Sequence, residues 1–583
     1  MKESARLGRG LDGWTLAARC VPFAVALVHA AVGISVLYRT QPNDDAFILF
    51  AYVKNLVGGQ GIVFWPGGPH AEGATDFLWM LLIAGLVRIG FDFAIAAACL
   101  NAVGAGLTSW LCGRAVGRVL GGGPAAFVLT LLSGSIVWLG GGLPSHLGFG
   151  TSAYTGLCVL LLALWIELPA RRIQWILWVG LVASLFRPDG AILFAGFAAL
   201  GLVRAWRGGA LASYSAHAVL TAAAGAGYYF WRFWYFGLAL PLPIYVKGHS
   251  AQKFSLSNAI SEPAAAFPGL APIRDWCSHS IGPVPLLIGF AVLAVASRRR
   301  WSASTLLIGF LPFLAHLAAL ALAQQSQNFG FRFEAPAWSA AFFGLVLAGA
   351  HATAAARAPA WRVAACATAV LAVLPGNYRM IRLFPLLTRD QTYLDTLAPR
   401  LRRILPRDRT IALTEPGRIA FWTSVRVIDV VGLNNPHTAI VPPDASYVRS
   451  LDPDAVVFYC DPGLFGFVES LDRSEDRVVP LDPESFTDLR RPEYRPVLEH
   501  GLPDWKPGLL PEHIASLALA RFLRESPNYD VYAVGTTRHN HVWALRHDLP
   551  ETAAILEGLR ATAGGELRES YAQSAELWLA PKR

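Results

Sequence analysis

Long apolar runs dominate the first two-thirds of the chain. Between residues 20 and 375 these runs alternate with short polar turns, and an apolar run of about 20 residues crosses a bilayer as an α-helix. We predict a polytopic membrane domain of about eleven spans, near residues 20–38, 93–113, 119–139, 150–168, 173–187, 189–203, 210–230, 281–297, 302–323, 336–350 and 363–376. The apolar segment 76–90 is predicted as a helix that lies at the outer face of the membrane without crossing it.

The last third of the chain has a different pattern. Apolar runs shorten after residue 376, and Pro, Asp and Arg become frequent. Short alternating runs predict strands near residues 409–414, 425–432, 454–460, 529–535 and 541–546. A period of 3.6 predicts helices near 511–526 and 550–563. The predicted fold is therefore mainly α: a transmembrane bundle, residues 1–376, followed by a soluble α/β domain, residues 377–583.

Composition agrees with a membrane protein. Hydrophobic residues make up 54% of the 583 residues and charged residues only 15%, against about 25% charged in a typical soluble domain. We interpret the first apolar run as an uncleaved anchor. A cleaved signal peptide is the alternative, because the preceding flank is basic in both cases.

Basic residues set the predicted topology. They gather at Lys2/Arg6/Arg9/Arg19, Arg114/Arg118, Arg171/Arg172, Arg204/Arg207, Arg298/Arg299/Arg300 and Arg357/Arg362. The positive-inside rule places these clusters in the cytoplasm. The soluble domain and the loops 39–92, 140–149, 187–189, 231–280 and 324–335 then lie on the extracytoplasmic side. We expect a multi-pass protein of a bacterial inner membrane, with its active site on that side.

Several classes of site are not indicated. The sequence has no metal-ligand spacing such as CxxC or HExxH, and no P-loop. Most of the seven cysteines fall in or beside apolar spans, where cysteine packs as a small hydrophobe. The net charge of +9 is spread over span ends and the polar tail, so it does not favour nucleic-acid binding.

Two adjacent acids open the first outer loop. Asn43 is placed to cap a helix that starts at Asp44 and carries Asp44 and Asp45 in its first turn. The acids then either favour the helix dipole alone or face a lipid-linked substrate. Neighbouring helical residues point about 100° apart. One acid can therefore face a cleft while the other orients it or holds a metal.

Three cations on outer loops are candidates for binding an anion. They are Arg187 in the turn RPDG, Lys247 after the segment LPLPIYV, and Arg332 in FGFRFEAP. Alternatives remain for two of them. Arg187 can extend to the lipid headgroups, and Arg332 can form a solvated ion pair with Glu334.

Other polar residues of these loops are weaker candidates. Glu72 and Asp76 are either plain surface acids or part of the site. Tyr245 beside Lys247 and Glu334 beside Arg332 are further candidate substrate contacts. His146 is expected to be structural more often than functional. His29 and His316 lie inside apolar spans, where we expect packing.

These segments, in this order, resemble a known family. NDDAFI, followed by VKNLVGGQGIVFWPGGPHAEGATDFLW, resembles the first outer loop of GT-C-type membrane glycosyltransferases, most closely the cell-wall arabinofuranosyltransferase branch. RPDG, LALPLPIYVKG, FGFRFEAP and RIAFWTSVRVIDVVGLNNPHTA resemble later segments of that branch. The series keeps its order across almost the whole chain.

The resemblance implies an activity. A polyprenyl-phosphate sugar would donate its sugar, which is arabinofuranose in the branch that the chain resembles, to a hydroxyl of an envelope glycan, lipid or protein, with inversion. Asp44 would be the base and Asp45 would assist it, or hold a divalent metal if one is used. Lys247, Arg332 and Arg187 would bind the lipid phosphate, and Glu72, Asp76, Tyr245, Glu334 and His146 are candidate substrate contacts.

The chain departs from the family pattern in places, and other functions stay open. Gly-Leu-Pro-Ser, residues 142–145, stands where the family often has Gly-Leu-Glu-Thr, and Trp65 stands where Asn is usual. A transporter or flippase for a polyprenyl-linked substrate is one alternative, although such proteins place ionisable groups near mid-membrane. A non-enzymatic envelope scaffold is the other.

Overall fold

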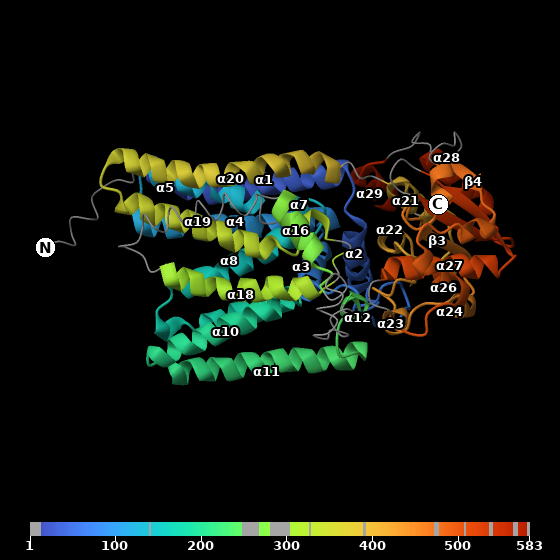
Figure 1. Ribbon diagram of the computed structural model, residues 1–583, viewed down its shortest axis with the longest axis horizontal. Helices are drawn as coiled ribbons and strands as arrows, with labels where there is room; N and C mark the ends of the chain where they lie inside the picture. The colour runs from blue at the N-terminus through green and yellow to red at the C-terminus, as the bar shows by residue number, and fades with distance from the viewer. Residues whose placement is uncertain are drawn as a thin grey trace.

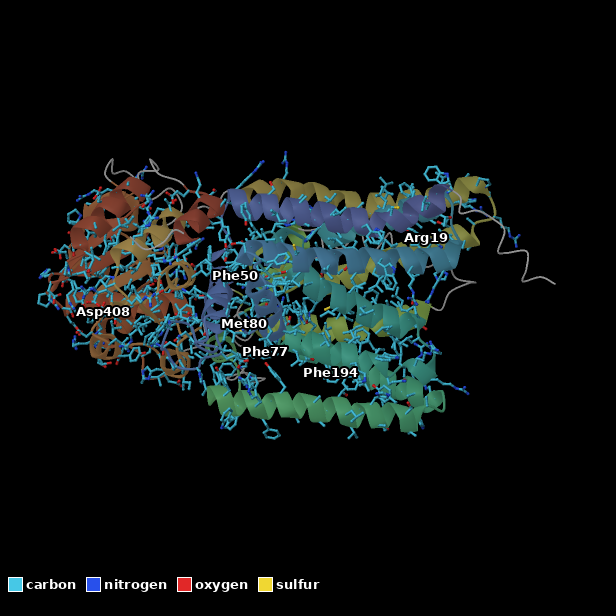
Figure 2. The ribbon with its side chains drawn as sticks, turned by 180° about the vertical axis from the view of Figure 1, so that it is seen from behind. Arg19, Phe50, Phe77, Met80, Phe194 and Asp408 are labelled. Carbon is cyan, nitrogen blue, oxygen red and sulfur yellow. The ribbon has the colours of Figure 1, made fainter. Side chains whose placement is uncertain are left out.

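The fold is a helical bundle with a smaller α/β region at one end (Figure 1). The computed structural model describes residues 13–138, 142–247, 267–279, 303–323, 325, 328–388, 392–471, 477–505, 509–535, 540–563 and 569–579. Arg19 and Asp408 mark opposite ends of the molecule (Figure 2).

Helices form the first part of the chain. Their bounds are α1 (Gly13–Arg39), α2 (Asp44–Val57), α3 (Phe77–Arg88), α4 (Phe93–Leu120), α5 (Pro124–Leu131), α6 (Ser133–Val137), α7 (Leu143–Ser145), α8 (Thr151–Glu167), η3 (Ala170–Arg172), α9 (Trp175–Phe186), α10 (Gly190–Arg207), α11 (Leu211–Phe236), α12 (Leu242–Lys247), α16 (Leu270–His279), α18 (Ala303–Leu322), η4 (Phe329–Phe331), α19 (Ala335–Ala355) and α20 (Pro359–Thr388).

The helical pattern confirms a membrane protein. Five described helices, α1, α4, α10, α18 and α19, are long and apolar enough to cross a membrane. Every predicted span coincides with helical structure except 281–297, which lies outside the described residues. Helix α3, in the segment predicted to lie at the outer face, has 12 residues and is about 18 Å long, shorter than a core of about 30 Å; α9, in the predicted span 173–187, has the same length.

A mixed sheet organises the C-terminal region. Its six strands have the order β2-β1-β3-β6-β5-β4, in which β1 pairs in parallel with β2 and β3 and the other pairs are antiparallel. The strands are β1 (Thr410–Leu413), β2 (Arg426–Asp429), β3 (Ala455–Tyr459), β4 (Val478–Pro480), β5 (Tyr529–Val534) and β6 (His541–Arg546). The predicted α/β character is confirmed, and β4 is the strand that the sequence pattern missed.

Helices cover this sheet and connect it to the bundle. They are α21 (Tyr393–Ile404), α22 (Gly417–Trp422), α23 (Pro436–Ile440), α24 (Ala445–Ser450), α25 (Val468–Leu471), η5 (Pro483–Thr487), η6 (Pro492–Tyr494), α26 (Arg495–His500), α27 (Pro511–Arg524), α28 (Thr552–Ala563) and α29 (Tyr571–Leu579). The boundary expected at residue 376 falls inside α20, which continues to Thr388.

The two parts share one core. Phe47 and Phe50 of α2 and Phe93 of α4 pack against Phe421 of α22, with ring centroids between 5.1 and 6.0 Å apart. Such aromatic contacts contribute about 0.5–1.5 kcal/mol each beyond the area they bury. The C-terminal region is therefore packed against the end of the bundle where α2 and α4 begin.

Candidate functional site

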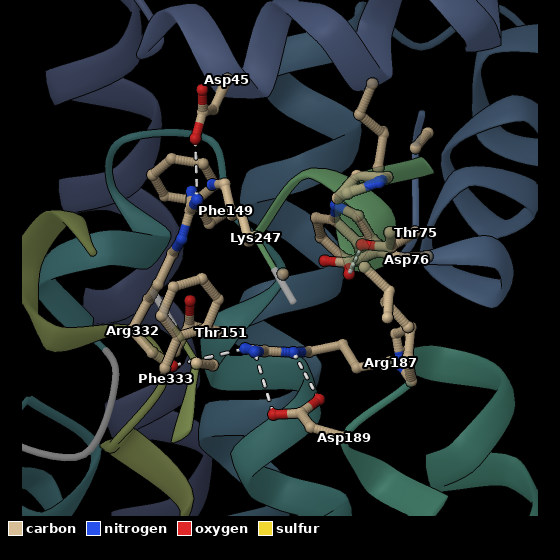
Figure 3. Close-up of a pocket in the computed structure, with 18 of the residues that line it drawn as sticks. Asp45, Thr75, Asp76, Phe149, Thr151, Arg187, Asp189, Lys247, Arg332 and Phe333 are labelled. Atoms are coloured by element: carbon tan, nitrogen blue, oxygen red, sulfur yellow. Dashed lines mark hydrogen bonds and ion pairs between the residues drawn. The ribbon is translucent and has the colours of Figure 1, made fainter. Parts of the chain in front are cut away.

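A cavity of about 430 Å³ lies at the end of the bundle that carries the C-terminal region. Side chains from distant segments line it, and the close-up shows several of them pointing into one space (Figure 3). Its polar lining is Asp45, Thr75, Asp76, Thr151, Arg187, Asp189, Lys247, His316, Gln325 and Arg332. Apolar side chains such as Ile48, Leu49, Ile192, Ile244 and Leu320 form much of the remaining wall.

Asp45 reaches the cavity from the first turn of α2. Asn43 caps this helix as predicted, because its side-chain oxygen accepts a hydrogen bond from the backbone N–H of Asp45 at 3.1 Å. The Asp45 carboxylate accepts a hydrogen bond from the Arg332 guanidinium at 2.7 Å. The guanidinium lies 4.0 Å from the ring centroid of Phe149, a cation–π contact that holds it beneath α2.

Arg187 occupies the opposite side of the cavity. Its Nε and one terminal nitrogen donate to the two oxygens of Asp189 at 3.1 and 3.0 Å. Its other terminal nitrogen donates to the backbone carbonyl of Arg332 at 3.3 Å. Burial alone would raise the pKa of Asp189, but the charge of Arg187 outweighs it and the pKa falls to about 2.

Lys247, at the end of α12, is the third cation of the lining. Burial lowers the pKa of its ammonium, Asp45 raises it and Arg332 lowers it further. The three cations predicted as an anion site therefore share one cavity with Asp45.

Asp76 also lines the cavity. It precedes α3 without capping it, and its carboxylate accepts a hydrogen bond from the Thr75 hydroxyl at 3.3 Å. Burial raises the pKa of this carboxyl, while Arg187 lowers it. Asp76 is thus a half-buried acid of the cavity lining that lies close enough to Arg187 to interact with its charge.

Asp44 lies outside this lining. Its carboxylate accepts hydrogen bonds from the backbone N–H groups of Gly417 and Arg418, at 3.0 and 2.9 Å. It also forms an ion pair of 3.1 Å with the Arg418 guanidinium. Burial raises the pKa of Asp44 to about 6, against the lowering effect of Arg418. Asp44 joins the bundle to the C-terminal region.

Lys54 completes this connection at the other end of α22. Its ammonium donates to the carbonyls of Ala420, Phe421 and Thr423 at 2.8, 2.7 and 2.7 Å. Three N–H donors thus meet three carbonyls at the C-terminal end of the helix, where positive charge is favoured. Helix α2 therefore holds α22 at both ends, and this fixes the position from which Asp45 projects.

A loop of the C-terminal region supplies part of the cavity wall. Leu433, which follows β2, belongs to the lining. Asp429 holds this loop by accepting hydrogen bonds from the N–H groups of Val431 and Asn434, at 3.0 and 2.8 Å. A Cβ on Gly73 of the first loop would lie 2.0 Å from Asn434 Oδ1, so the two loops meet at a residue without a side chain.

Four predicted substrate contacts lie elsewhere among the described residues. Glu72 forms a buried ion pair with Arg232 of α11. Glu334 is fully buried and accepts a hydrogen bond from the Asn328 amide at 2.7 Å. His146 lies against His29, with ring centroids 4.6 Å apart, beside a different cavity. Tyr245 packs against the core of the C-terminal region.

His316 is a site residue that the sequence analysis missed. It lies in α18, lines the cavity and is hydrogen-bonded through Nε2 to Asp189 Oδ2 at 2.9 Å. His316 is packed as expected, but the expectation did not include this hydrogen bond, because nothing in the surrounding apolar run indicates a polar partner. The sequence feature that indicates this contact is its partner, Asp189, the acid in the turn RPDG.

A metal site was left open by the sequence. Among the described residues, no three His, Cys, Asp or Glu side chains converge as a metal ion would require. Two carboxylates of the cavity form ion pairs with guanidinium groups, Asp45 with Arg332 and Asp189 with Arg187.

Part of the chain matches a known domain family, and much of it is similar to solved structures of another protein. Residues 378–532 match a family described as a domain of unknown function, DUF8728. No curated protein matches the chain. Two solved structures of ArnT from Cupriavidus metallidurans are similar, each at 13% sequence identity. The one bound to undecaprenyl phosphate covers 78% of this chain and 94% of its own, with a TM-score of 0.49. The apo structure covers 79% and 95%, with a TM-score of 0.47.

Proposed function

We propose that the protein is a membrane glycosyltransferase that moves a sugar from a polyprenyl phosphate to an acceptor hydroxyl. The observation that carries the proposal is the cavity in which Arg187, Lys247, Arg332 and Asp45 meet. Asp45 and Arg332 are 287 positions apart in the chain, and both belong to segments that resemble GT-C glycosyltransferases.

The cations fit the phosphate of such a donor. Arg187 and Arg332 present planar guanidinium groups, which match phosphate oxygens, and Lys247 adds a compact charge. The apolar wall formed by residues such as Ile192, Ile244 and Leu320 fits the prenyl chain next to the phosphate. A cavity that combines these two features suits an amphipathic lipid phosphate better than a free sugar nucleotide.

Asp45 is the proposed base, in place of Asp44. Asp45 faces the cavity, whereas both oxygens of Asp44 accept hydrogen bonds from backbone N–H groups of the C-terminal region. An acid that holds two domains together cannot also approach an acceptor without breaking those bonds. Asp44 is therefore a positioning residue for α2, and Asp76 is the second acid available to a substrate in the cavity.

The reaction is a single displacement. Asp45 takes the proton of the acceptor hydroxyl as the oxygen forms a bond to the anomeric carbon of the sugar. The bond between that carbon and the phosphate oxygen breaks, and its electron pair leaves with the lipid phosphate. Arg187, Arg332 and Lys247 stabilise the charge that grows on the phosphate. Attack opposite the leaving group inverts the anomeric carbon.

We further propose that the cavity lies at the extracytoplasmic end of the bundle. Helix α4 begins against the C-terminal region, where Phe93 and Phe421 meet, and carries Arg114 and Arg118 in its last turns. Basic residues at that far end favour the cytoplasm. An envelope glycan, lipid or protein would then supply the acceptor, and the motif resemblance makes arabinofuranose the first donor sugar to test.

The test follows the donor lipid in living cells. Cells that lack this chain should accumulate one polyprenyl-phosphate sugar, detected by mass spectrometry of extracted lipids. The wild-type chain and the control Asp408→Asn, a change of an exposed acid, should restore the normal level. Asp45→Asn should not restore it, although the variant reaches the membrane. Unchanged lipid levels in the deleted cells would refute the proposed reaction.

A further inference from the structure

His316 is fully buried in α18, a helix long enough to cross a membrane, yet it faces a charged site. A polar group buried in such a helix is costly unless it is paired, and its presence commonly marks a functional site. The partner of His316 is Asp189, at the start of α10, with Nε2 and Oδ2 2.9 Å apart.

Asp189 is not used as an ordinary helix cap. It occupies the position before Gly190, the first residue of α10, but its side chain makes no capping hydrogen bond. An aspartate at this position usually accepts a bond from the first free N–H groups of the helix. Here both oxygens are directed to Arg187, and Oδ2 is shared with His316. The histidine therefore fixes the orientation of the carboxylate.

The carboxylate in turn fixes the Arg187 guanidinium. A guanidinium has five N–H donors in one plane. Three of them are directed to Asp189 and to the carbonyl of Arg332. The group is also held between the rings of Tyr154 and Phe333, at 4.9 and 5.2 Å from their centroids. The remaining N–H groups, one on each terminal nitrogen, are the ones available to a ligand in the cavity.

We propose that His316 is a positioning residue for the lipid phosphate. Acting through Asp189, it orients the guanidinium of Arg187 so that the two remaining N–H groups point at phosphate oxygens. This inference rests on the proposed function, because it assigns the phosphate of the donor to Arg187. Its competitor is a purely structural role, in which His316 only holds α18 against α10.

A pair of lipids distinguishes the two roles. Undecaprenyl phosphate and undecaprenol have the same prenyl chain, but only the first has a phosphate. Loss of a structural contact disturbs the cavity for both lipids, whereas misorientation of Arg187 affects only the phosphate. The measurement is the affinity of the purified full-length protein, in lipid nanodiscs, for each of the two lipids.

Three variants complete the test. His316→Asn is too short to reach Asp189, and His316→Gln retains a donor nitrogen at the distance of Nε2. We expect His316→Asn to bind undecaprenyl phosphate about ten- to a hundredfold more weakly, the weakening expected for a lost hydrogen bond to a charged group, with undecaprenol unchanged. His316→Gln should recover most of the loss. The control His351→Asn, in α19 and outside the cavity lining, should bind both lipids as the wild type does.

The outcomes separate the two claims. Equal weakening for both lipids, no weakening for either, or failure of His316→Gln to exceed His316→Asn would overturn the positioning role. A wild-type protein that binds undecaprenol as tightly as undecaprenyl phosphate would instead refute the proposed function. The glutamine variant preserves volume and hydrogen bonding, so it keeps the comparison valid if the asparagine variant does not fold.

Discussion

The carboxylate of Asp45 lies 2.7 Å from the guanidinium of Arg332, although 287 positions separate the two residues in the chain. Helix α2 brings the acid to the cavity, and the loop before α19 brings the cation. In the reaction proposed above, the pair would put the base and a ligand of the lipid phosphate side by side.

The cations of the cavity should determine the affinity for a phosphate lipid. Replacing Arg332 by Gln removes a charge and a planar donor pair while preserving much of the side-chain length. We expect binding of undecaprenyl phosphate to weaken about ten- to a hundredfold, as for loss of a hydrogen bond to a charged group, in a direct binding assay. Arg449→Gln, a change in an exposed ion pair with Glu525, is the matched control. Equal affinities in the two variants would remove Arg332 from the phosphate site.

Asp44 and Asp45 should differ in the property that each controls. Asp44→Asn replaces one of the two oxygens that accept backbone N–H bonds by an NH2 group, which cannot accept one, so we expect it to lower the free energy of unfolding by about 1–3 kcal/mol. Asp45→Asn should abolish sugar transfer with a smaller effect on unfolding. Thermal unfolding and transfer assays on both variants test this division. The reverse result, with Asp44→Asn folded normally but inactive, would return the base role to Asp44.

The raised pKa of Asp44 predicts a pH effect with a definite sign. Burial raises it from 3.8 to about 6, so between these values the folded state binds more protons than the unfolded chain. The free energy of unfolding therefore falls as pH rises from about 4 to about 6. Asp44→Asn should show a smaller fall over this range in thermal unfolding. Asp429, whose pKa burial also raises to about 6, is present in both proteins, so their difference reports Asp44. Identical slopes would contradict the shift.

The contact between Gly73 and the loop after β2 should be sensitive to a single methyl group. A Cβ at Gly73 would lie 2.0 Å from Asn434 Oδ1 and 2.6 Å from the Leu433 carbonyl oxygen. Gly73→Ala should therefore displace the loop that contributes Leu433 to the cavity and reduce transfer at least tenfold, since small misplacements in an active site are costly. At Gly85 a Cβ meets nothing within 4 Å. Gly85→Ala should retain activity, and equal activity of both variants would separate the C-terminal loop from the site.

The sequence predicted where helices form better than it predicted which side chains of distant segments contact each other. The start of α2 was predictable because a capping residue, two acids and an apolar run occur together there. The sequence did not predict which of the two acids faces the cavity. Asp44 and Asp45 point to different sides of the helix, and the hydrogen-bond partner of Asp44 lies 373 positions away in the chain. His316 lacked any local signal, since its hydrogen-bond partner Asp189 lies 127 positions earlier in the chain, just before α10. Strand β4 has three residues and ends at a proline, which is too short for an alternating pattern.

The boundary between the two parts of the chain stays a prediction, and residue 376 lies inside helix α20. Hydropathy falls near residue 377, but α20 continues to Thr388. The end of an apolar run therefore does not mark the end of the helix that contains it. The docking of α22 onto α2 depends on Asp44 and Lys54, which are polar residues in an otherwise apolar interface. Their role becomes visible only when both ends of α22 are seen against α2.

The most direct measurement is a density map of the full-length protein with undecaprenyl phosphate. The account predicts that the phosphate lies in the cavity within hydrogen-bond distance of Arg187 and Arg332 and near Lys247, with the first isoprene units against Ile192, Ile244 or Leu320. Asp45 should then border the open side of the phosphate, where a sugar would stand. A phosphate bound elsewhere, with these side chains still paired as they are here, would contradict the account.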